Sequence, residues 1–347
     1  MRLGAGLFGA VFALGFAEIA AAQDHGALVD RAIEGHVLPG YARLSAETAA
    51  LSASAEAYCG GEAAFEAVET AYHAAFDAWM GVSHLRFGPS EADDRAFAIA
   101  FWPDSRGTTP RTLAALIASE DPVVDDPAGF SEVSIAARGL FALDALLFDP
   151  VSGGASAPGS YPCRLLTAIA GDVAFGAAAI ERDWAAGYAD LMRAPGPRNP
   201  VYASAAEASA ELFGALSAGL EATADLRLGR PLGSFDRPRP RRAEAWRSGR
   251  PQRNAVLSLA ALAQLAERAF LPELSPEDAQ DVRDAFDRAL EVAARFEPPM
   301  TEAVADPARR IGVEAARAAV RSVQAAAAEK IGGALGLSAG FNALDGD

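Results

Sequence analysis

Apolar residues that recur every three or four positions run through most of this chain, and alanine fills many of the positions between them. Such spacing places the apolar side chains on one face of a helix, and alanine is the strongest helix former. Clusters of β-branched residues long enough to make strands are missing from the sequence. The sequence therefore predicts an all-α fold. The clearest amphipathic helix spans 62–85, and its apolar face consists of Phe65, Val68, Tyr72, Phe76, Trp79 and Met80.

The same spacing predicts a series of further helices. A helix that opens at Thr108 or Thr109 should run toward Ala118, and one over 131–148 is apolar nearly all round, as expected at the centre of a bundle. Ser275 is an expected N-cap. The other predicted helices span 27–58, with a kink or break at Pro39-Gly40, and then 164–191, 203–228, 252–270, 276–296 and 307–331.

A proline-rich segment divides the predicted helices. Residues 193–200 hold three prolines within six positions and cannot continue a helix. We place a domain boundary there, with an N-terminal helical bundle over 23–192 and a C-terminal bundle over 201–347. Similar helix counts on the two sides suggest about four helices in each bundle.

The first 22 residues read as a cleaved signal peptide. Arg2 precedes an almost unbroken apolar run from Leu3 to Ala17, and three alanines offer a cleavage site before Gln23. No cysteine follows this site, so no lipid anchor is expected, and no later apolar run looks long enough to span a bilayer. We expect an exported protein of the periplasm or cell envelope without stable membrane insertion. A formal net charge of −16 argues against binding to nucleic acid or to an anionic membrane.

The two cysteines, Cys59 and Cys163, both sit at expected element boundaries. In an oxidising compartment the simplest interpretation is one disulfide, and the alternative is a pair of free buried thiols.

Catalytic motifs are missing from the sequence. It holds four histidines but no His-Glu-x-x-His zinc pattern, nucleophile elbow or phosphate loop. Glu69, His73 and Asp77 are four residues apart in series and share one helix face, where they could hold a metal. We favour the alternative, a solvated stripe opposite the apolar face.

Three short segments, which we call islands, differ in composition from the acidic, alanine-rich remainder of the chain. The first is the arginine cluster, in which seven arginines and one glutamate lie from Arg237 to Arg253. A guanidinium group can bind a carboxylate or a phosphate with two parallel hydrogen bonds. The second island runs from Trp102 to Gly107. The third is the C-terminal segment 340–347, with the sequence Gly-Phe-Asn-Ala-Leu-Asp-Gly-Asp.

Together these islands resemble the imelysin family, periplasmic helical proteins associated with iron uptake and historically filed as metallopeptidases. The segment 138–147 resembles the helix with the family motif Gly-x-His-x-x-Glu. Gly139 matches the glycine, Phe141 stands in place of the histidine, and Asp144 replaces the glutamate. Phenylalanine cannot ligate a metal or move a proton, so at most half of the family's metal site is present.

Asp144 lies in a nearly all-apolar helix, where an unpaired carboxylate is costly, so we expect a cationic partner from the arginine cluster. We predict that the charged groups of the islands converge between the two bundles, either as a ligand site or as an ion-pair network that only fastens the bundles. Asp144 and Glu244 are weak candidates for binding iron or another metal ion. The complete predicted site is Trp102, Asp104, Arg106, Arg138, Asp144, Arg241, Glu244, Trp246, Arg247, Arg250, Arg253, Asn254 and Asp345.

The leading functional hypothesis is a non-catalytic binding or accessory protein of the cell envelope, linked to uptake of iron or a metal ligand as the resemblance implies, with other envelope or iron-uptake components as partners. The alternatives are a metallopeptidase, which needs a complete ligand set and a general base, and a structural or partner-binding envelope protein.

Overall fold

The computed structural model describes residues 24–149, 157–297 and 299–338, and within them the chain is helical, with a single isolated antiparallel bridge between Ser234 and Arg237. The all-α prediction is confirmed. The helices are α1 (His25–Ala32), α2 (Leu38–Cys59), α3 (Phe65–Val82), α4 (Arg95–Ile99), α5 (Thr108–Ser119), α6 (Pro127–Ser131), α7 (Gly139–Phe148), α8 (Tyr161–Asp183), α9 (Ala189–Arg193), α10 (Ala205–Glu221), α11 (Arg230–Leu232), α12 (Pro251–Leu265), α13 (Pro276–Arg295), α14 (Met300–Ala303), α15 (Arg310–Ala326) and α16 (Gly333–Leu335).

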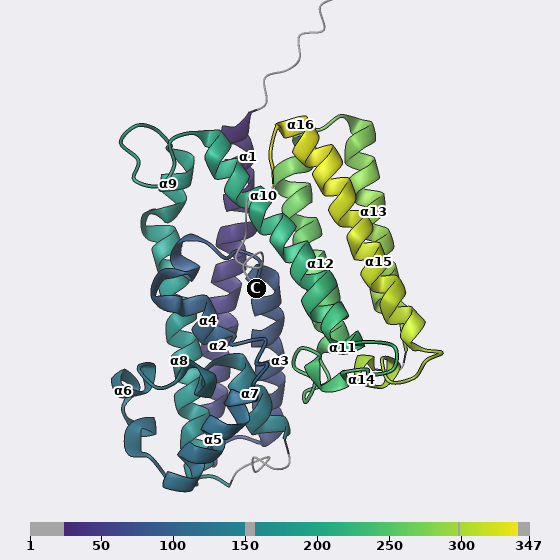
Figure 1. Cartoon of the computed structure of the whole chain (residues 1–347). Helices are drawn as coiled ribbons and strands as arrows, with labels where there is room; N and C mark the ends of the chain where they lie inside the picture. The colour runs from purple at the N-terminus through teal and green to yellow at the C-terminus, as the bar shows by residue number, and fades with distance from the viewer. Residues whose placement is uncertain (1–23, 150–156, 298, 339–347) are drawn as a thin grey trace, which may run out of the picture.

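The long helices form two groups (Figure 1). Helices α2, α3, α7 and α8 pack together in the N-terminal half, and α10, α12, α13 and α15 pack together in the C-terminal half. Between the halves, α3 packs against α12, and α1 packs against α10 and against the π-helical turn Ala266–Phe270 that follows α12. One continuous cluster of buried apolar side chains runs through both groups. The division at 193–200 into two domains stays a prediction, although these residues do lie between α9 and α10, outside any helix.

Of the two outcomes predicted at Pro39-Gly40, a kink or a break, the break is wrong. Helix α1 continues through a π-helical turn, Ile33–Val37, directly into α2, with Pro39 in the first turn of α2. A wider turn before a proline accommodates the missing N–H without ending the helix.

The single helix predicted over 131–148 is also wrong. The chain forms α6, a short 3₁₀ turn at Ile135–Ala137 and then α7. Gly139 causes the interruption because its φ of +80° lies in the left-handed region. A Cβ atom at Gly139 would lie 2.3 Å from the carbonyl oxygen of Ala98, so glycine lets α7 begin directly against the end of α4.

The remaining helix ends differ less from the prediction. Helix α8 begins earlier, at Tyr161, and a π-helical turn at Trp184–Tyr188 separates it from α9. Ser275 caps α13 as predicted, because its Oγ accepts from the amide of Asp278 at 3.1 Å.

Two helical stretches, Tyr161–Arg193 and Pro251–Glu273, are long and apolar enough for a membrane span by length and composition, so the expectation that no such run follows the signal peptide is wrong. About half of each apolar window is buried inside the protein, at 50% and 56%. Core helices of a helical bundle have the same length and apolar composition, so these two stretches are only weak evidence for a membrane span. The predicted signal peptide lies outside the described residues.

The predicted disulfide between Cys59 and Cys163 is confirmed, and it joins the end of α2 to the first turn of α8. The two cysteines are 104 residues apart in sequence. Closing a loop of this length restricts the unfolded chain and stabilises the protein by about 4 to 5 kcal/mol at most.

We predict that titration of the unfolded, unreduced protein finds no free thiol. Replacing both cysteines by serine should lower the free energy of unfolding by about 2 to 4 kcal/mol, because the unfolded chain regains its loop freedom. Urea denaturation with and without reductant measures both effects. Two reactive thiols in the unreduced protein would contradict the pairing.

Candidate functional site

The loop from Trp102 to Gly107 joins α4 to α5. Asp104 accepts hydrogen bonds from the amides of Thr108 at 2.9 Å and Thr109 at 2.8 Å, and it therefore caps α5 in place of the threonines that we predicted as caps. Burial acts against ionisation of Asp104, but these amide donors outweigh it and lower its pKa. Trp102 stacks on Phe141 of α7, with ring centroids 6.1 Å apart. Arg106 is exposed and forms no ion pair among the described residues.

Asp144 is almost completely buried, with 1% of its surface exposed. Its Oδ1 accepts from the Ser248 hydroxyl at 2.5 Å, the Ser248 amide at 3.1 Å and the Tyr72 hydroxyl at 3.3 Å. The expected cation is present but farther away, since Arg247 Nη1 lies 3.8 Å from Oδ2. Arg247 binds Asp149 more closely, with Nε 2.9 Å from Oδ2. Burial raises the pKa of Asp144, although the Ser248 hydroxyl and Arg247 oppose this effect.

Arg250 is buried, with 1% of its surface exposed, at the contact between α3 and α12. Its Nη2 pairs with Asp77, and its Nη1 contacts the ring nitrogen Nδ1 of His73 at 2.9 Å and the His73 carbonyl at 3.2 Å. Its Nε donates to the side-chain oxygen of Asn254 at 3.1 Å, and Arg253 holds the same Asp77 carboxylate from the solvent side. Although burial acts in the opposite direction, the two guanidinium groups lower the pKa of Asp77.

The solvated stripe that we favoured for His73 and Asp77 is wrong, because both side chains face the arginine cluster of the other half. Asp77 was missed as a site residue. The sequence did place Asp77 on the same α3 face as His73, four residues later. Its partner, Arg250, is evident only once α3 packs on α12.

Glu244 pairs with Arg227, whose Nε lies 2.9 Å from Oε2. Both side chains are buried, with 3% and 8% exposed. Arg227 lies in a π-helical turn after α10, outside the cluster noticed in the sequence, and so it was missed. Two arginines lie over the Trp246 ring, with the Arg247 and Arg241 guanidinium carbons 4.6 and 5.4 Å from its centroid.

Not every predicted residue joins this arrangement. Arg138 makes a bidentate ion pair with Asp172 of α8 within the N-terminal half, with Nε 2.9 Å from Oδ2 and Nη2 2.8 Å from Oδ1. Asp345 lies outside the described residues. Tyr72 and Ser248 contact Asp144 but were missed, because Tyr72 was assigned to the apolar face of its helix and Ser248 carried no signal of its own within the arginine cluster.

A pair of histidines lies near the same contact between the halves. His36 Nε2 and His84 Nε2 are 3.0 Å apart, and His36 Nδ1 contacts the side-chain oxygen of Gln264 at 2.9 Å. Burial lowers the pKa of His36 to about 4, although the Gln264 hydrogen bond opposes it. Burial also lowers the pKa of His84 well below its usual range, and His36 and Arg227 add to this effect.

A cavity of about 850 Å³ opens between the halves beside these groups. Its volume falls within the range of small-molecule sites, roughly 300 to 1,000 Å³. Its polar lining includes both members of the Arg227–Glu244 pair, and among the described residues Arg227 Nη1 has no hydrogen-bond partner. The aromatic lining consists of Trp79, Phe87, Phe97, Trp102 and Phe141, and the other polar side chains are Ser83, His84, Arg86, Glu91, Glu207, Glu211 and Ser338.

The Imelysin family model, also called Peptidase_M75, matches residues 37–327, which is most of the chain. The chain belongs to the imelysin family. An imelysin-like protein from Psychrobacter arcticum has the same fold, with a TM-score of 0.78, 17% identity, and coverage of 92% of this chain and 100% of that chain. A protein from Parabacteroides distasonis, provisionally described as an iron-regulated protein A precursor, gives a TM-score of 0.72 at 12% identity over 91% of this chain and 97% of that chain. No curated protein matches the sequence.

The side chains at the imelysin motif do not fit a metal ion. Phe141 packs against Trp102 and Phe76, and Asp144 already accepts three hydrogen bonds. Glu244, the other candidate, is occupied by Arg227. Among the described residues no group of three or more His, Cys, Asp or Glu side chains could hold a metal ion. In this member of the family the motif helix therefore contributes packing and a buried carboxylate.

We predict that Arg250→Gln destabilises the protein by about 3 to 5 kcal/mol, because it leaves Asp77 poorly compensated in a buried site. Arg253→Gln should cost about 1 kcal/mol or less, since its side chain is 59% exposed and Arg250 still holds the carboxylate. Urea denaturation of both variants measures the difference. Equal losses would show that Arg250 has no special role at the contact.

We also predict that the histidine pair makes folding sensitive to acid. Unfolded histidine titrates near pH 6.5, so between pH 6.5 and about 4 the unfolded chain binds protons that the folded pair does not. Stability present above pH 6.5 is then lost as the pH falls, by about 1.4 kcal/mol per pH unit for each histidine. Denaturation of the wild type and of a His36→Gln/His84→Gln variant at several pH values isolates this contribution. Parallel curves for the two proteins would contradict it.

Proposed function

We propose that this imelysin-family member is an exported, non-catalytic binding protein of the cell envelope, which takes a small ligand linked to iron or metal uptake into the cavity between its halves. The observation that carries the proposal is the cavity itself, with its aromatic lining and a buried arginine, Arg227, whose Nη1 has no hydrogen-bond partner in the described part of the chain. An ion-pair network whose only role was to fasten the halves would not require such a space beside it.

The lining of the cavity favours an organic ligand with an aromatic body. Trp102 and Phe141 offer flat surfaces for stacking, and Arg227 Nη1 can donate to an anionic or carbonyl oxygen. The described residues offer a bare metal ion no group of three or more ligands, which favours iron bound as a complex whose organic ligand makes the contacts. The Parabacteroides protein, described as iron-regulated and as a precursor, supports the link to iron and the exported location.

A metallopeptidase is the second candidate, and the family name is its main support. Phe141 at the histidine position and the three hydrogen bonds that Asp144 Oδ1 already accepts count against it. Chelator-sensitive cleavage of a protein substrate that disappears in Asp144→Ala would favour the peptidase and contradict our proposal.

A steric block of the cavity tests the binding role. Gly214 of α10 lines the cavity, and a Cβ atom there would meet nothing within 4 Å. We predict that Gly214→Phe folds normally and abolishes binding of an aromatic ferric complex, such as iron tris-catecholate, measured by calorimetry and by tryptophan fluorescence.

Gly81→Phe is the matched control. Gly81 is also a half-buried helical glycine with open space at its Cβ position, and it does not line the cavity. Binding should survive in this variant. Wild-type protein that binds neither catecholate nor carboxylate complexes of iron would overturn the proposed ligand class, and equal binding by both variants would place the ligand elsewhere.

A further inference from the structure

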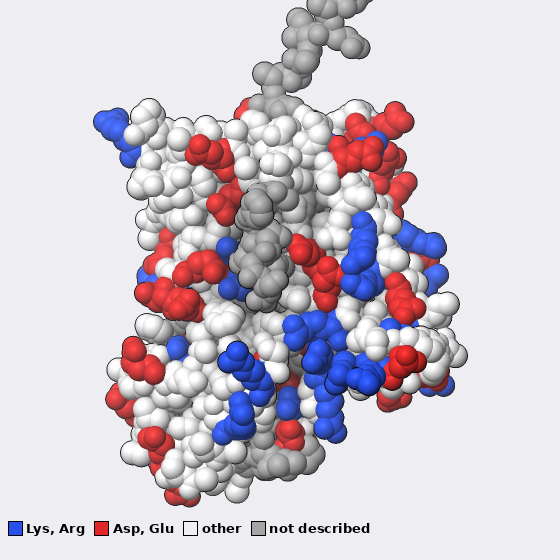
Figure 2. All heavy atoms as spheres, in the orientation of Figure 1, with Lys and Arg blue, Asp and Glu red and all other residues white. Residues whose placement is uncertain are grey.

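A second surface of the protein, remote in sequence from the α7 motif, has a strong positive charge. The segment 230–242 contains five arginines and one carboxylate, Asp236, in a chain whose net charge is −16. Figure 2 shows Lys and Arg atoms gathered in the lower middle of the molecule, where α11 lies in Figure 1. None of these five arginines forms an ion pair within the part of the chain that the structure describes: Arg230, Arg237, Arg239, Arg241 and Arg242.

The arginines are crowded on a short, stiff loop. Ser234 and Arg237 close a tight turn, and Pro238 and Pro240 restrict the backbone that follows. The side chain of Arg230 is partly buried, and its Nε has no hydrogen-bond partner among the described residues. Burial and the nearby Arg242 both lower the pKa of Arg230. Unpaired like charges held this closely repel each other, and an external anion would relieve that repulsion.

Two strongly exposed apolar side chains lie at the same end of the C-terminal half. Phe235 and Ile311 are 68% and 69% exposed, the highest values among large apolar residues described here apart from Phe175. The Arg310 guanidinium lies over the Phe235 ring, 5.7 Å from its centroid, and Ile311 is the next residue along the chain. Aromatic and aliphatic groups beside arginine are typical of the centres of protein interfaces.

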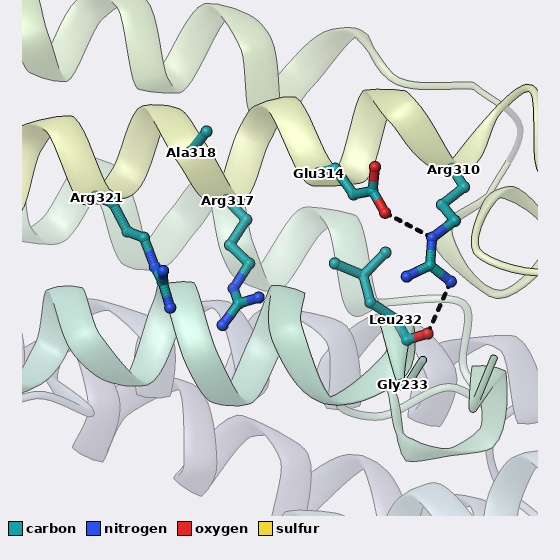
Figure 3. A pocket seen from close by; sticks show the side chains of 7 residues that line it. All are labelled: Leu232, Gly233, Arg310, Glu314, Arg317, Ala318 and Arg321. Carbon is teal, nitrogen blue, oxygen red and sulfur yellow. Dashed lines mark hydrogen bonds and ion pairs between the residues drawn. The ribbon is translucent and has the colours of Figure 1, made fainter. Parts of the chain in front are cut away.

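A cleft of about 280 Å³ adjoins the loop (Figure 3). Arg310, Arg317 and Arg321 of α15 line one side, with Leu232 and Gly233 opposite. Arg310 is held by Glu314 at 2.6 Å and the Leu232 carbonyl at 2.9 Å, whereas Arg317 and Arg321 share Asp225 at 2.6 and 2.9 Å. Arg317 Nε is buried and has no partner in the described parts of the chain.

The cleft and the loop form one continuous surface. A Cβ atom on Gly233, which lines the cleft, would lie 2.9 Å from the Arg239 side chain of the loop. We call this surface the basic face and define it by Arg237, Arg239, Arg242, Arg317, Phe235 and Ile311.

We propose that the basic face docks an acidic, amphipathic segment of a partner protein, with carboxylates on the loop arginines and in the cleft and an apolar side chain on Phe235 and Ile311. Charge complementarity supports this partner, because guanidinium groups bind carboxylates with two parallel bonds. A compact segment meets only the basic face. An anionic bilayer is wider than this face and would also meet the acidic side chains around it, which repel the bilayer wherever they come within a Debye length of about 8 to 10 Å.

The test uses the full-length mature protein and a fluorescent 15-residue peptide with two glutamates for each leucine. We expect saturable binding in an anisotropy titration, weaker at higher salt, and no binding of an analogue with glutamine in place of glutamate. The triple variant Arg237→Gln/Arg239→Gln/Arg242→Gln should bind the acidic peptide roughly tenfold more weakly or worse.

The matched control replaces three other exposed arginines that lack ion pairs among the described residues, Arg43, Arg198 and Arg268, by glutamine. It makes the same change in net charge and should bind within about twofold of the wild type. Thermal melts of both variants verify folding. Equal losses in the two variants, or no binding by the wild type, would overturn the proposal. Binding to vesicles of phosphatidylcholine and phosphatidylglycerol without binding to the peptide would assign the face to a membrane and overturn the choice of partner.

Discussion

The contact between the two halves depends on a guanidinium group that is almost fully buried. Arg250, at the start of α12, reaches Asp77 and His73 on α3, and a buried arginine is tolerated only where its donors are matched by acceptors. The turn just before it presents Ser248 to Asp144 of α7. Residues 247–250 thus tie two helices of the N-terminal half, α3 and α7, to the start of α12 through charged and polar groups.

This polar contact also explains why a cavity can persist between the halves. Apolar helix faces of this kind, rich in alanine, tend to close on each other until no space remains. Here the spacing along the contact is set by the reach of arginine and carboxylate side chains in the Arg250–Asp77 and Arg247–Asp149 pairs, and the Arg227–Glu244 pair forms part of the cavity wall. Trp102 and Phe141 then line the remaining space without filling it.

The packing of α7 also accounts for the motif positions that this chain shares with its family and for the position at which it differs. Gly139 is required by the close approach of α7 to α4, and Asp144 is required by Ser248 and Tyr72, so both positions have structural reasons to remain. Phe141 has no metal or proton chemistry and instead joins the aromatic wall. Family membership therefore fixes the architecture, while the side chains at the motif differ from those of the family pattern in this chain.

The sequence by itself determined the helical class, the proline-rich interruption between α9 and α10, the cysteine pairing and the unusual character of the arginine cluster, because each depends on local propensity or on composition. It also indicated that Asp144 needs a partner, since a carboxylate in an apolar helix must be compensated. Only the tertiary structure decided which groups meet. The packing of α3 on α12 brings Asp77, which we expected on a solvated face, to Arg250, and Arg227 pairs with Glu244. Arg138 pairs with Asp172, and Ser248 lies nearest Asp144, where we expected an arginine. These pairings depend on distances between segments far apart in the chain, which helical periodicity does not encode.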